Sequence, residues 1–342
     1  MVHTHLSIVD ENHVVADSAD SNLIREFVAQ ADVAGPTKVA YRSQLEEFRS
    51  WLAHPKTRRS GGHGSLTDAT RADVTRFMAY LTAGERYAAP QHHRLVHVLS
   101  PSSRKRFIAS LKSFYCFLMS VDLVDRDPTY GVARPKIKLR PGLYLSVEEL
   151  RRLLEAPGSS RDRIQVYLLA FTGARTNEIR TLCWRDVNFT DGTLRLLGKG
   201  DKYRTVDIHP RLMPELRRWR LQQDVMAERS PVVHASRQQA QTDFVLLSVH
   251  GRQLSHTAIY KQLKRRACLA GLYVLDPAHR EFRSEVTPHV LRRTFATILL
   301  NSGNPMDAVA DVLGHSYVDT TRKHYAFASD ARRRATIESF NV

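Results

Sequence analysis

Apolar residues recur at helical intervals over the N-terminal third of the chain. A Gly-Pro pair at residues 35–36 separates the first two helical stretches, and Thr67 or Thr70 can cap the third. The apolar positions are Leu23, Phe27, Val28, Val39, Tyr41, Leu45, Phe48, Trp51, Leu52, Val74, Phe77, Met78, Leu81, Phe107, Leu111, Phe114 and Leu118. The pattern predicts a four-helix domain over residues 20–133. Residues 1–19 have no sustained period, so we expect them to form a poorly ordered tail.

A loss of periodicity then separates this region from the rest of the chain. Prolines and basic residues are frequent over residues 134–145, which we interpret as a linker. A capping-box pattern at residues 146–149 begins a second domain, residues 146–342. Within it, residues 193–197 and 203–208 have the character of strands joined by turn-forming residues, which predicts a β-hairpin. The expected fold class is mainly α with two domains, the second a mixed α+β domain with a small β-sheet or hairpin.

The charge of the chain narrows the class of partner. Of its 342 residues, 51 are Lys or Arg and 35 are Asp or Glu, which gives a formal charge of +16. This excess favours a polyanionic partner over the alternative of a merely soluble basic protein. We find no apolar run long enough to cross a membrane and no signal-peptide pattern, so we expect a cytoplasmic, nucleoid-associated protein. The three cysteines form no C-x-x-C pair, and we expect no metal site.

The densest group of residues with chemical potential lies near the C-terminal end. A helix with an N-cap and a first-turn proline places His289 and Arg292 on one face. A second helix ends at Gly314, which leaves His315 on the following turn. A third short helix would carry Tyr325. Each residue alone is more simply explained as structural, but their combination indicates a catalytic site.

This combination resembles the tyrosine recombinases, the family of the phage integrases and the Xer-type recombinases. The motifs that carry the resemblance are H-x-L-R, L-G-H and a downstream tyrosine, together with an upstream T-G-A-R-T-N-E-I segment and an L-G-K-G hairpin. The motifs occur in family order over the C-terminal half. The resemblance implies a catalytic set of Arg175, Lys199, His289, Arg292, His315 and Tyr325. We expect Glu178, three residues after Arg175, to orient that arginine or its loop, because a buried guanidinium needs acceptors for its donors.

Two assignments within this set have alternatives. Lys202 competes with Lys199 at the hairpin, and we prefer Lys199 because it occupies the place of the lysine in the family's G-K-G hairpin. Tyr317 also follows His315, but it lies too near the turn to move on a helix of its own. In many family members the tyrosine lies one residue closer to the histidine. We assign Tyr325 as the nucleophile.

The residue types suit cleavage of DNA without a metal ion or a nucleotide, so we expect no cofactor. A phenol is a better leaving group than an alkoxide, and a phosphotyrosyl bond therefore conserves the energy needed for rejoining. Arg175 and Arg292 suit the non-bridging phosphate oxygens. Histidine can donate to the same oxygens, and His289 can also accept the proton of Tyr325. Lys199 would protonate the departing 5′ oxygen.

The N-terminal helices resemble the core-binding, SAM-like domain of the same family, although only in pattern. Polar and basic residues gather where its helices begin, and backbone N–H groups there also favour anions. The candidate phosphate contacts are Thr37, Lys38, Arg42, Ser102, Arg104 and Lys105. The alternative for each is an ordinary solvated basic surface.

The resemblance implies a site-specific DNA recombinase that acts on double-stranded recombination sites through a 3′-phosphotyrosyl intermediate and a Holliday junction. It also implies a homotetramer on two DNA sites, with the C-terminal segment exchanged between subunits. Accessory DNA-bending proteins or a partner recombinase are further possible partners. We expect a role in integration or excision of a mobile element. The alternatives are Xer-type resolution of chromosome or plasmid dimers and a catalytically inactive DNA-binding relative.

Overall fold

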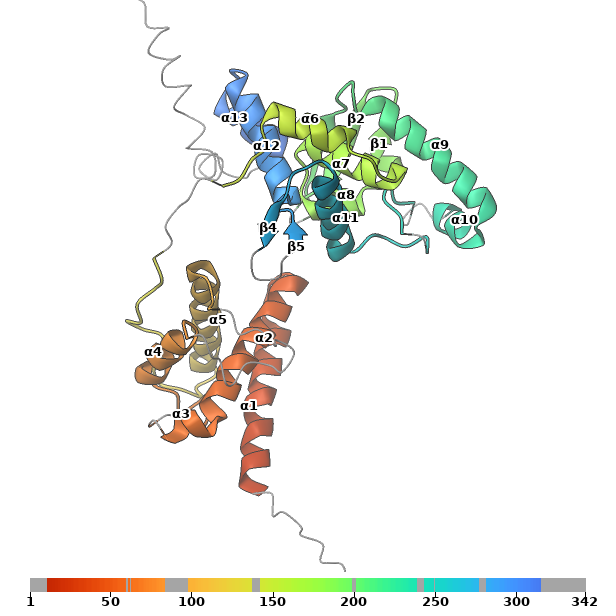
Figure 1. Cartoon of the computed structure of the whole chain (residues 1–342). Coiled ribbons are helices and arrows are strands. Elements are labelled where there is room, and N and C mark those ends of the chain that lie inside the picture. The colour runs from red at the N-terminus through yellow and green to blue at the C-terminus, as the bar shows by residue number, and fades with distance from the viewer. Residues whose placement is uncertain are drawn as a thin grey trace, which may run out of the picture. The chain divides into compact units, whose positions relative to one another are not determined.

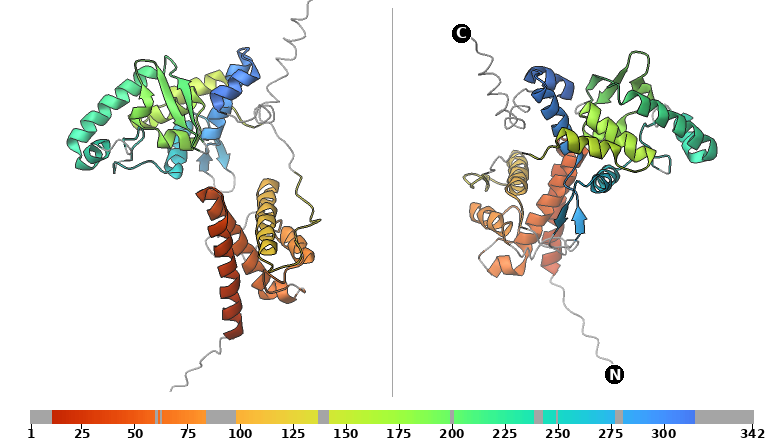
Figure 2. Two further views of the ribbon diagram at one scale, coloured as in Figure 1. Left: turned by 180° about the vertical axis from the view of Figure 1, so that it is seen from behind. Right: turned by 45° about the horizontal axis from the view of Figure 1, so that its top comes forward.

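The computed structural model describes residues 11–59, 61, 63–83, 98–136, 142–198, 201–238, 243–248, 250–276 and 281–314. The chain divides into two compact units, residues 1–139 and residues 140–342, and each is described by itself (Figures 1 and 2). Most described residues are helical, and the strands form two small antiparallel sheets. The predicted mainly α fold class is therefore confirmed. Within the described ranges, no helix has both the length and the apolar character needed to cross a membrane.

The secondary structure in the described residues of unit 1 is entirely helical. The helices are α1 (Glu11–Gln30), α2 (Gly35–Ala53), α3 (Pro55–Arg59), α4 (Arg71–Tyr80) and α5 (Pro101–Ser120). The helix α1 begins at Glu11, so the expected tail over residues 1–19 is wrong from Glu11 onward. The physical reason is that the sequence has no glycine or proline between Glu11 and Gly35, and nothing there stops the helix from extending toward the N-terminus.

Aromatic side chains form much of the core of unit 1. Phe48 is fully buried, and its ring centroid lies 4.8 Å from that of Phe77. Phe114 is also fully buried and packs edge-on against Phe27 from α1 at 5.5 Å. The buried Tyr115 hydroxyl donates to the backbone oxygen of Leu66 at 2.8 Å, which satisfies its polar end. The predicted apolar faces of α1, α2, α4 and α5 therefore meet in one core, except at Val39 of α2, which is 70% exposed.

Unit 2 surrounds the helix α7, which contacts α6, α8, α9, α11 and α12 (Figure 1). Its elements are α6 (Val147–Glu155), α7 (Ser160–Thr172), α8 (Thr176–Thr181), a 3-10 turn (Trp184–Asp186), β1 (Val187–Asn188), β2 (Thr193–Leu197), β3 (Tyr203–Asp207), α9 (Met213–Arg229), α10 (Pro231–Gln238), α11 (His256–Leu269), β4 (Val274–Asp276), β5 (Glu281–Arg283), α12 (Pro288–Asn301) and α13 (Met306–Leu313). The predicted capping box that begins α6 is present.

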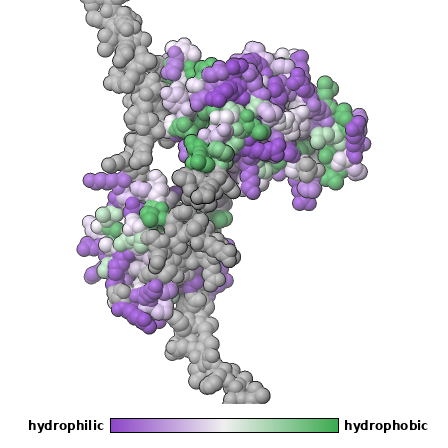
Figure 3. All heavy atoms as spheres, viewed as in Figure 1, coloured by the Kyte–Doolittle hydropathy of each residue, from purple (hydrophilic) through white to green (hydrophobic). Residues whose placement is uncertain are grey.

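The strands of unit 2 are short. In order β1-β2-β3 they form an antiparallel sheet in which Leu197 pairs with Tyr203, as the predicted hairpin requires. A separate hairpin, β4–β5, exposes Val274, Leu275 and Phe282, and apolar side chains gather over it (Figure 3). These residues make it the most conspicuous apolar patch on the viewed face.

Buried polar side chains tie the helices of unit 2 together. Arg266 of α11 is 2% exposed and donates to two carbonyl oxygens near the end of α6, that of Leu153 at 3.0 Å and that of Leu154 at 2.8 Å. Arg163 of α7 forms two hydrogen bonds of 2.9 Å with the carboxylate of Glu215 in α9. Arg266 thus provides donors for carbonyl oxygens at the end of α6 that would otherwise lack partners.

One carboxylate organises the start of α4 in unit 1. Asp73 is fully buried, and its side chain accepts from the backbone nitrogen of Thr70 at 2.9 Å and from the Thr70 hydroxyl at 2.7 Å. His63 Nδ1 lies 2.8 Å from the same carboxylate, and Arg76 donates to it at 2.6 Å. Burial alone would raise the pKa of Asp73, but these hydrogen bonds lower it to about 2.

We predict that Asp73→Asn lowers the stability of unit 1. A folded-state pKa below the ordinary value of 3.8 means that the stabilisation is present above about pH 4 and is lost as the pH falls toward 2. The wild-type contribution at pH 7 is about 2 kcal/mol. Hydrogen exchange of α4 and α5 amides at pH 7 and at pH 3 measures it. Asp68→Asn, which alters an exposed carboxylate nearby, is the control. An equal pH dependence in wild type and Asp73→Asn would contradict the assignment.

Candidate active site

The site is built where α7 turns sharply into α8. The helix α7 ends at Gly173, whose backbone is left-handed with φ of 57°. A side chain at this glycine would place its Cβ 2.6 Å from Phe295 Cδ1 and 2.8 Å from Leu313 Cδ2. Only glycine fits both the backbone angle and the space. The turn therefore brings Arg175, two residues later, next to α12 and α13.

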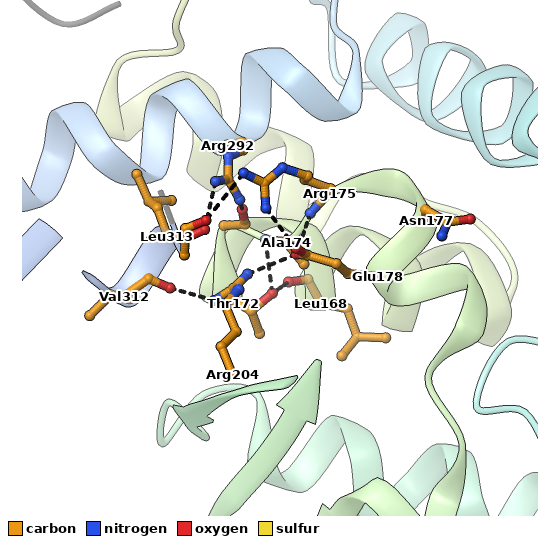
Figure 4. Close-up of polar contacts among 12 residues, drawn as sticks. Leu168, Thr172, Ala174, Arg175, Asn177, Glu178, Arg204, Arg292, Val312 and Leu313 are labelled. Carbon is orange, nitrogen blue, oxygen red and sulfur yellow. Dashed lines mark hydrogen bonds and ion pairs between the residues drawn. The ribbon is translucent and has the colours of Figure 1, made fainter. Parts of the chain in front are cut away.

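Three arginines from different parts of unit 2 donate to three consecutive carbonyl oxygens at the end of α13 (Figure 4). The pairs are Arg204 Nη1 with Val312, Arg292 Nη2 with Leu313 at 2.6 Å, and Arg175 Nη2 with Gly314 at 3.3 Å. The last carbonyls of a helix have no partner within the helix, and the helix dipole makes this end attractive to cations. The arginines supply both the donors and the charge.

Glu178 holds two of these arginines in place. Its carboxylate accepts from the backbone nitrogen of Arg175 at 2.8 Å, from Arg175 Nη1 at 2.9 Å and from Arg204 Nη2 at 2.8 Å (Figure 4). Glu178 is 1% exposed, and this burial acts to raise its pKa, but the adjacent Arg204 and Arg175 lower the pKa below its usual value. The carboxylate is thus held charged between the two guanidinium groups.

The helix α12 carries the other described candidates. Thr287 caps it by accepting from the backbone nitrogen of Val290 at 3.3 Å, and Pro288 occupies its first turn, as the sequence predicts. Arg292 is 5% exposed, and its Nη1 donates to the backbone oxygen of Gly173 at 2.7 Å. His289 lies on the first turn of the same helix and is exposed. The helix thus presents the histidine outward and the arginine to the turn after α7.

The structure brings together part of the predicted catalytic set. Arg175, Glu178 and Arg292 meet around the end of α13, and His289 lies one turn from Arg292. Lys199, His315, Tyr325 and the alternative Tyr317 lie outside the described residues. Their assignments stay predictions.

The hairpin beside the site is described up to its tip. Gly198 donates from its backbone nitrogen to the backbone oxygen of Lys202 at 2.8 Å, which closes the hairpin. The left-handed Asp201, with φ of 55°, lies between them, and Lys202 is exposed. Lys199 follows Gly198 directly in the sequence but lies outside the described residues.

Sequence reasoning missed Arg204. It lies on β3, where alternation places Arg204 and Val206 on the same face, and Val206 is 6% exposed. An arginine on the inward face of a strand needs an acceptor in the interior. That pattern could have indicated an ion pair, although the partner, Glu178, lies 26 residues away in the sequence.

In unit 1 the candidate phosphate contacts lie in the N-terminal halves of α2 and α5. Arg42, Ser102 and Lys105 are exposed. The Lys38 ammonium instead donates to the backbone oxygen of Ala29 near the end of α1, at 3.1 Å. A groove of about 770 Å³ runs along α5, and the basic and aromatic side chains that line it are Lys105, Lys112, Tyr130 and Arg134. Lys112, Tyr130 and Arg134 were not among the predicted contacts.

Among the residues that the structure describes, no three His, Cys, Asp or Glu side chains are arranged to hold a metal ion. The charge of the described part of the site is cationic, since Arg175 and Arg204 pair with Glu178 while Arg292 donates to backbone oxygens. Such a group is suited to hold an anion with several oxygen atoms.

The sequence matches two protein-family models. The phage integrase family model matches residues 144–332, and the model of the phage integrase N-terminal SAM-like domain matches residues 24–121. Tyrosine recombinase XerD of Pseudomonas putida is 30% identical over 312 residues, which cover 89% of this chain and 92% of the relative. Tyrosine recombinase XerC of Roseiflexus sp. is 28% identical over 317 residues, 90% of each chain.

Solved structures show the same fold. The XerH site-specific recombinase bound to difH substrate, in a pre-cleavage complex, superposes with a TM-score of 0.64 at 23% identity and covers 98% of this chain and 91% of its own. The Tn1549 transposon integrase bound to transposon right end DNA gives a TM-score of 0.59 at 16% identity, covering 93% of this chain and 98% of its own.

We predict that Glu178→Ala strongly destabilises unit 2. The change leaves Arg175 and Arg204 near each other without the carboxylate that both contact, and breaking a buried ion pair typically costs about 3–5 kcal/mol. Urea unfolding followed by hydrogen exchange of α7 amides measures the loss. The control, Glu148→Ala, removes an exposed ion pair with Arg151 and should change stability little. Equal stability of the two variants would refute the role of Glu178.

Proposed function

This chain belongs to the phage integrase family of tyrosine recombinases, and from that premise we propose that it cleaves and rejoins DNA strands at specific sites. The observation that carries the proposal is the convergence of Arg175 and Arg292 on the end of α13, directly before His315. By this proposal, the two guanidinium groups bind the scissile phosphate together with the predicted histidines and the hairpin lysine. The sites, by this proposal, lie in double-stranded DNA.

The two arginines offer different access to a phosphate. The side chain of Arg175 is 36% exposed although it is anchored by Glu178, so one edge of its guanidinium stays open to a ligand. Arg292 is 5% exposed and is anchored at both terminal nitrogens to backbone oxygens. We infer that Arg175 makes the more open contact with a non-bridging oxygen and that Arg292 contributes a fixed charge behind it.

The reaction that we propose balances without a cofactor. The phenolic oxygen of Tyr325 forms a bond to the scissile phosphorus while the bond from phosphorus to the 5′ oxygen breaks. His289 accepts the phenolic proton, and Lys199 gives a proton to the departing oxygen. His315 would donate to a non-bridging oxygen beside the arginines. Rejoining is the reverse of these steps, with the 5′ oxygen as nucleophile.

We further propose that unit 1 binds the DNA backbone. The support is the groove along α5, where Lys105, Lys112 and Arg134 lie beside the exposed Tyr130. Arg42 and Ser102, exposed at the starts of helices, would add phosphate contacts, as would Thr37, Lys38 and Arg104. Contacts of this kind position a protein on DNA without reading its sequence.

Assembly and biological role are also proposals. We propose a homotetramer on two sites, with the C-terminal segment exchanged between subunits and a Holliday junction as intermediate. Integration or excision of a mobile element is the first candidate role. The XerD and XerC relatives, which match along about 90% of their length, favour the second candidate, resolution of chromosome or plasmid dimers with or without a partner recombinase. The genes flanking this one would separate the two roles.

The nucleophile assignment predicts a difference between two tyrosines. Tyr325→Phe should bind duplex DNA but form no covalent adduct, because the attacking oxygen is missing. Tyr317→Phe, the matched control, should still be trapped on a substrate nicked near the cleavage site. Denaturing gel electrophoresis of the protein–DNA adduct is the measurement. Peptide mapping that finds the 3′-phosphate on Tyr317 would reverse the assignment, and a binding-competent wild type that forms no adduct would favour the inactive relative.

The role of Lys199 can be tested separately from its charge. A general acid typically contributes about 10² to 10⁴ in rate, so Lys199→Ala should cleave normal DNA slowly. Sulfur in place of the bridging 5′ oxygen leaves as a thiolate without needing a proton, and the variant should be substantially rescued on that substrate. Lys202→Ala should be near normal on both. Rescue of Lys202→Ala instead would move the general acid three residues along the hairpin.

A further inference from the structure

We propose that Arg204 is a positioning residue for strand cleavage, which couples the β2–β3 hairpin to the end of α13 and to the anchor of Arg175. The inference rests on the proposed function. Arg204 reaches no phosphate in this scheme. It acts by fixing where Arg175 and the backbone before His315 lie, and by making the hairpin and the α13 turn one rigid assembly.

The contacts of Arg204 join two elements of the site. Its side chain is 12% exposed, and Nη2 donates to Glu178 Oε2 at 2.8 Å while Nη1 donates to the backbone oxygen of Val312 (Figure 4). One planar guanidinium thus spans from the carboxylate that orients Arg175 to the last turn of α13. A lysine, with a single ammonium group, would not hold both acceptors in this fixed geometry.

Gly314 makes room for this arginine. A Cβ added at Gly314 would lie 2.5 Å from Arg204 Cδ, and the backbone there is left-handed with φ of 64°. The glycine of the L-G-H motif therefore does two things. It ends α13 in the conformation that glycine favours, and it lets the Arg204 side chain pass against the chain immediately before His315.

The other side of the hairpin meets the same carboxylate. A Cβ at Gly198 would lie 3.7 Å from Glu178 Oε1 and 3.2 Å from the backbone oxygen of Lys202. Gly198 directly precedes Lys199 in the sequence, and Arg204 follows the tip. One strand of the hairpin therefore passes close to Glu178 at Gly198, and the other is bonded to it through Arg204.

The contribution of Arg204 to the stability of the fold does not by itself explain why it contacts both Glu178 and Val312. The Arg204 Nε is buried and, among the described residues, has no hydrogen-bond partner. A buried donor without a partner costs free energy, and buried ion pairs are often no more stabilising than apolar packing. The arrangement does fix geometry, because it sets Arg175, the hairpin and the α13 turn relative to one another.

The test compares single-turnover cleavage by Arg204→Ala, Arg204→Lys and Arg195→Ala, with DNA affinity and thermal unfolding measured on the same full-length proteins. Arg195 is the matched control, because it lies on the same hairpin and pairs with Asp186 at 2.9 Å, and none of its hydrogen bonds or ion pairs with described residues involves Glu178 or α13. We expect cleavage by Arg204→Ala to fall about 10²-fold, the order of loss caused by a small misplacement of catalytic groups. Its DNA affinity should stay within about twofold of wild type. Arg195→Ala should cleave normally.

A second substrate separates positioning from general weakening of the fold. Replacing one non-bridging oxygen of the scissile phosphate with a methyl group removes the charge that Arg175 would neutralise. If Arg204 acts through Arg175, most of the defect in Arg204→Ala should disappear on this neutral substrate, as it should for Arg175→Ala. A merely destabilised protein would be equally slow on both substrates.

The outcomes separate this inference from the function on which it rests. Wild type that forms no covalent adduct would overturn both. Wild type that cleaves, with Arg204→Ala unaffected or equally defective on the two substrates, would overturn the positioning role alone. Should Arg204→Ala fail to fold, Arg204→Lys decides. A folded, DNA-binding lysine variant with normal cleavage would show that charge suffices and that the two-point contact is not needed.

Discussion

The geometry of the site depends on how the end of α13 is satisfied. The carbonyl oxygens in the last turn of a helix lack partners within the helix, and they carry the negative end of its dipole. Here arginines from the turn before α8, from β3 and from α12 donate to three consecutive oxygens. The unpaired carbonyl oxygens at the end of α13 are therefore satisfied by arginines of the proposed site, so the position of α13 and the positions of these arginines depend on each other.

Repulsion between the positive charges of these arginines opposes their convergence on the end of α13. Arg175 and Arg204 both bond to Glu178, and their positive charges would repel each other without that carboxylate. The buried carboxylate of Glu178 accepts hydrogen bonds from both, and its lowered pKa keeps it ionised well below neutral pH. Arg292 donates to the backbone oxygens of Gly173 and Leu313. The two proposed phosphate contacts are thus anchored in different ways.

Local patterns in the sequence located most helix starts and the hairpin. The caps at Ser146 and Thr287 and the pairing of β2 with β3 depend on residues within a few positions of one another, and all three are present. Residues 244–248 show where such patterns stop being informative. Phe244 bridges to Cys183 and Leu247 bridges to Gln253, so the segment pairs with two neighbours and forms no continuous ladder. The bridge to Cys183 joins segments far apart in the sequence, which periodicity does not reveal.

The sequence by itself determined the fold class, the charge and the order of the motifs, since these depend on composition and short-range spacing. It also indicated Glu178 as the partner of Arg175, because the two lie three residues apart at the start of a helix. The role of Arg204 was decided only by tertiary structure. Its acceptor at Val312 is 108 residues away, and the contact exists because the glycine turns at Gly173 and Gly314 let α7, α12, α13 and the hairpin approach closely. Spacing along a chain predicts contacts within a helix or a hairpin, whereas contacts between elements depend on the packing of the whole core.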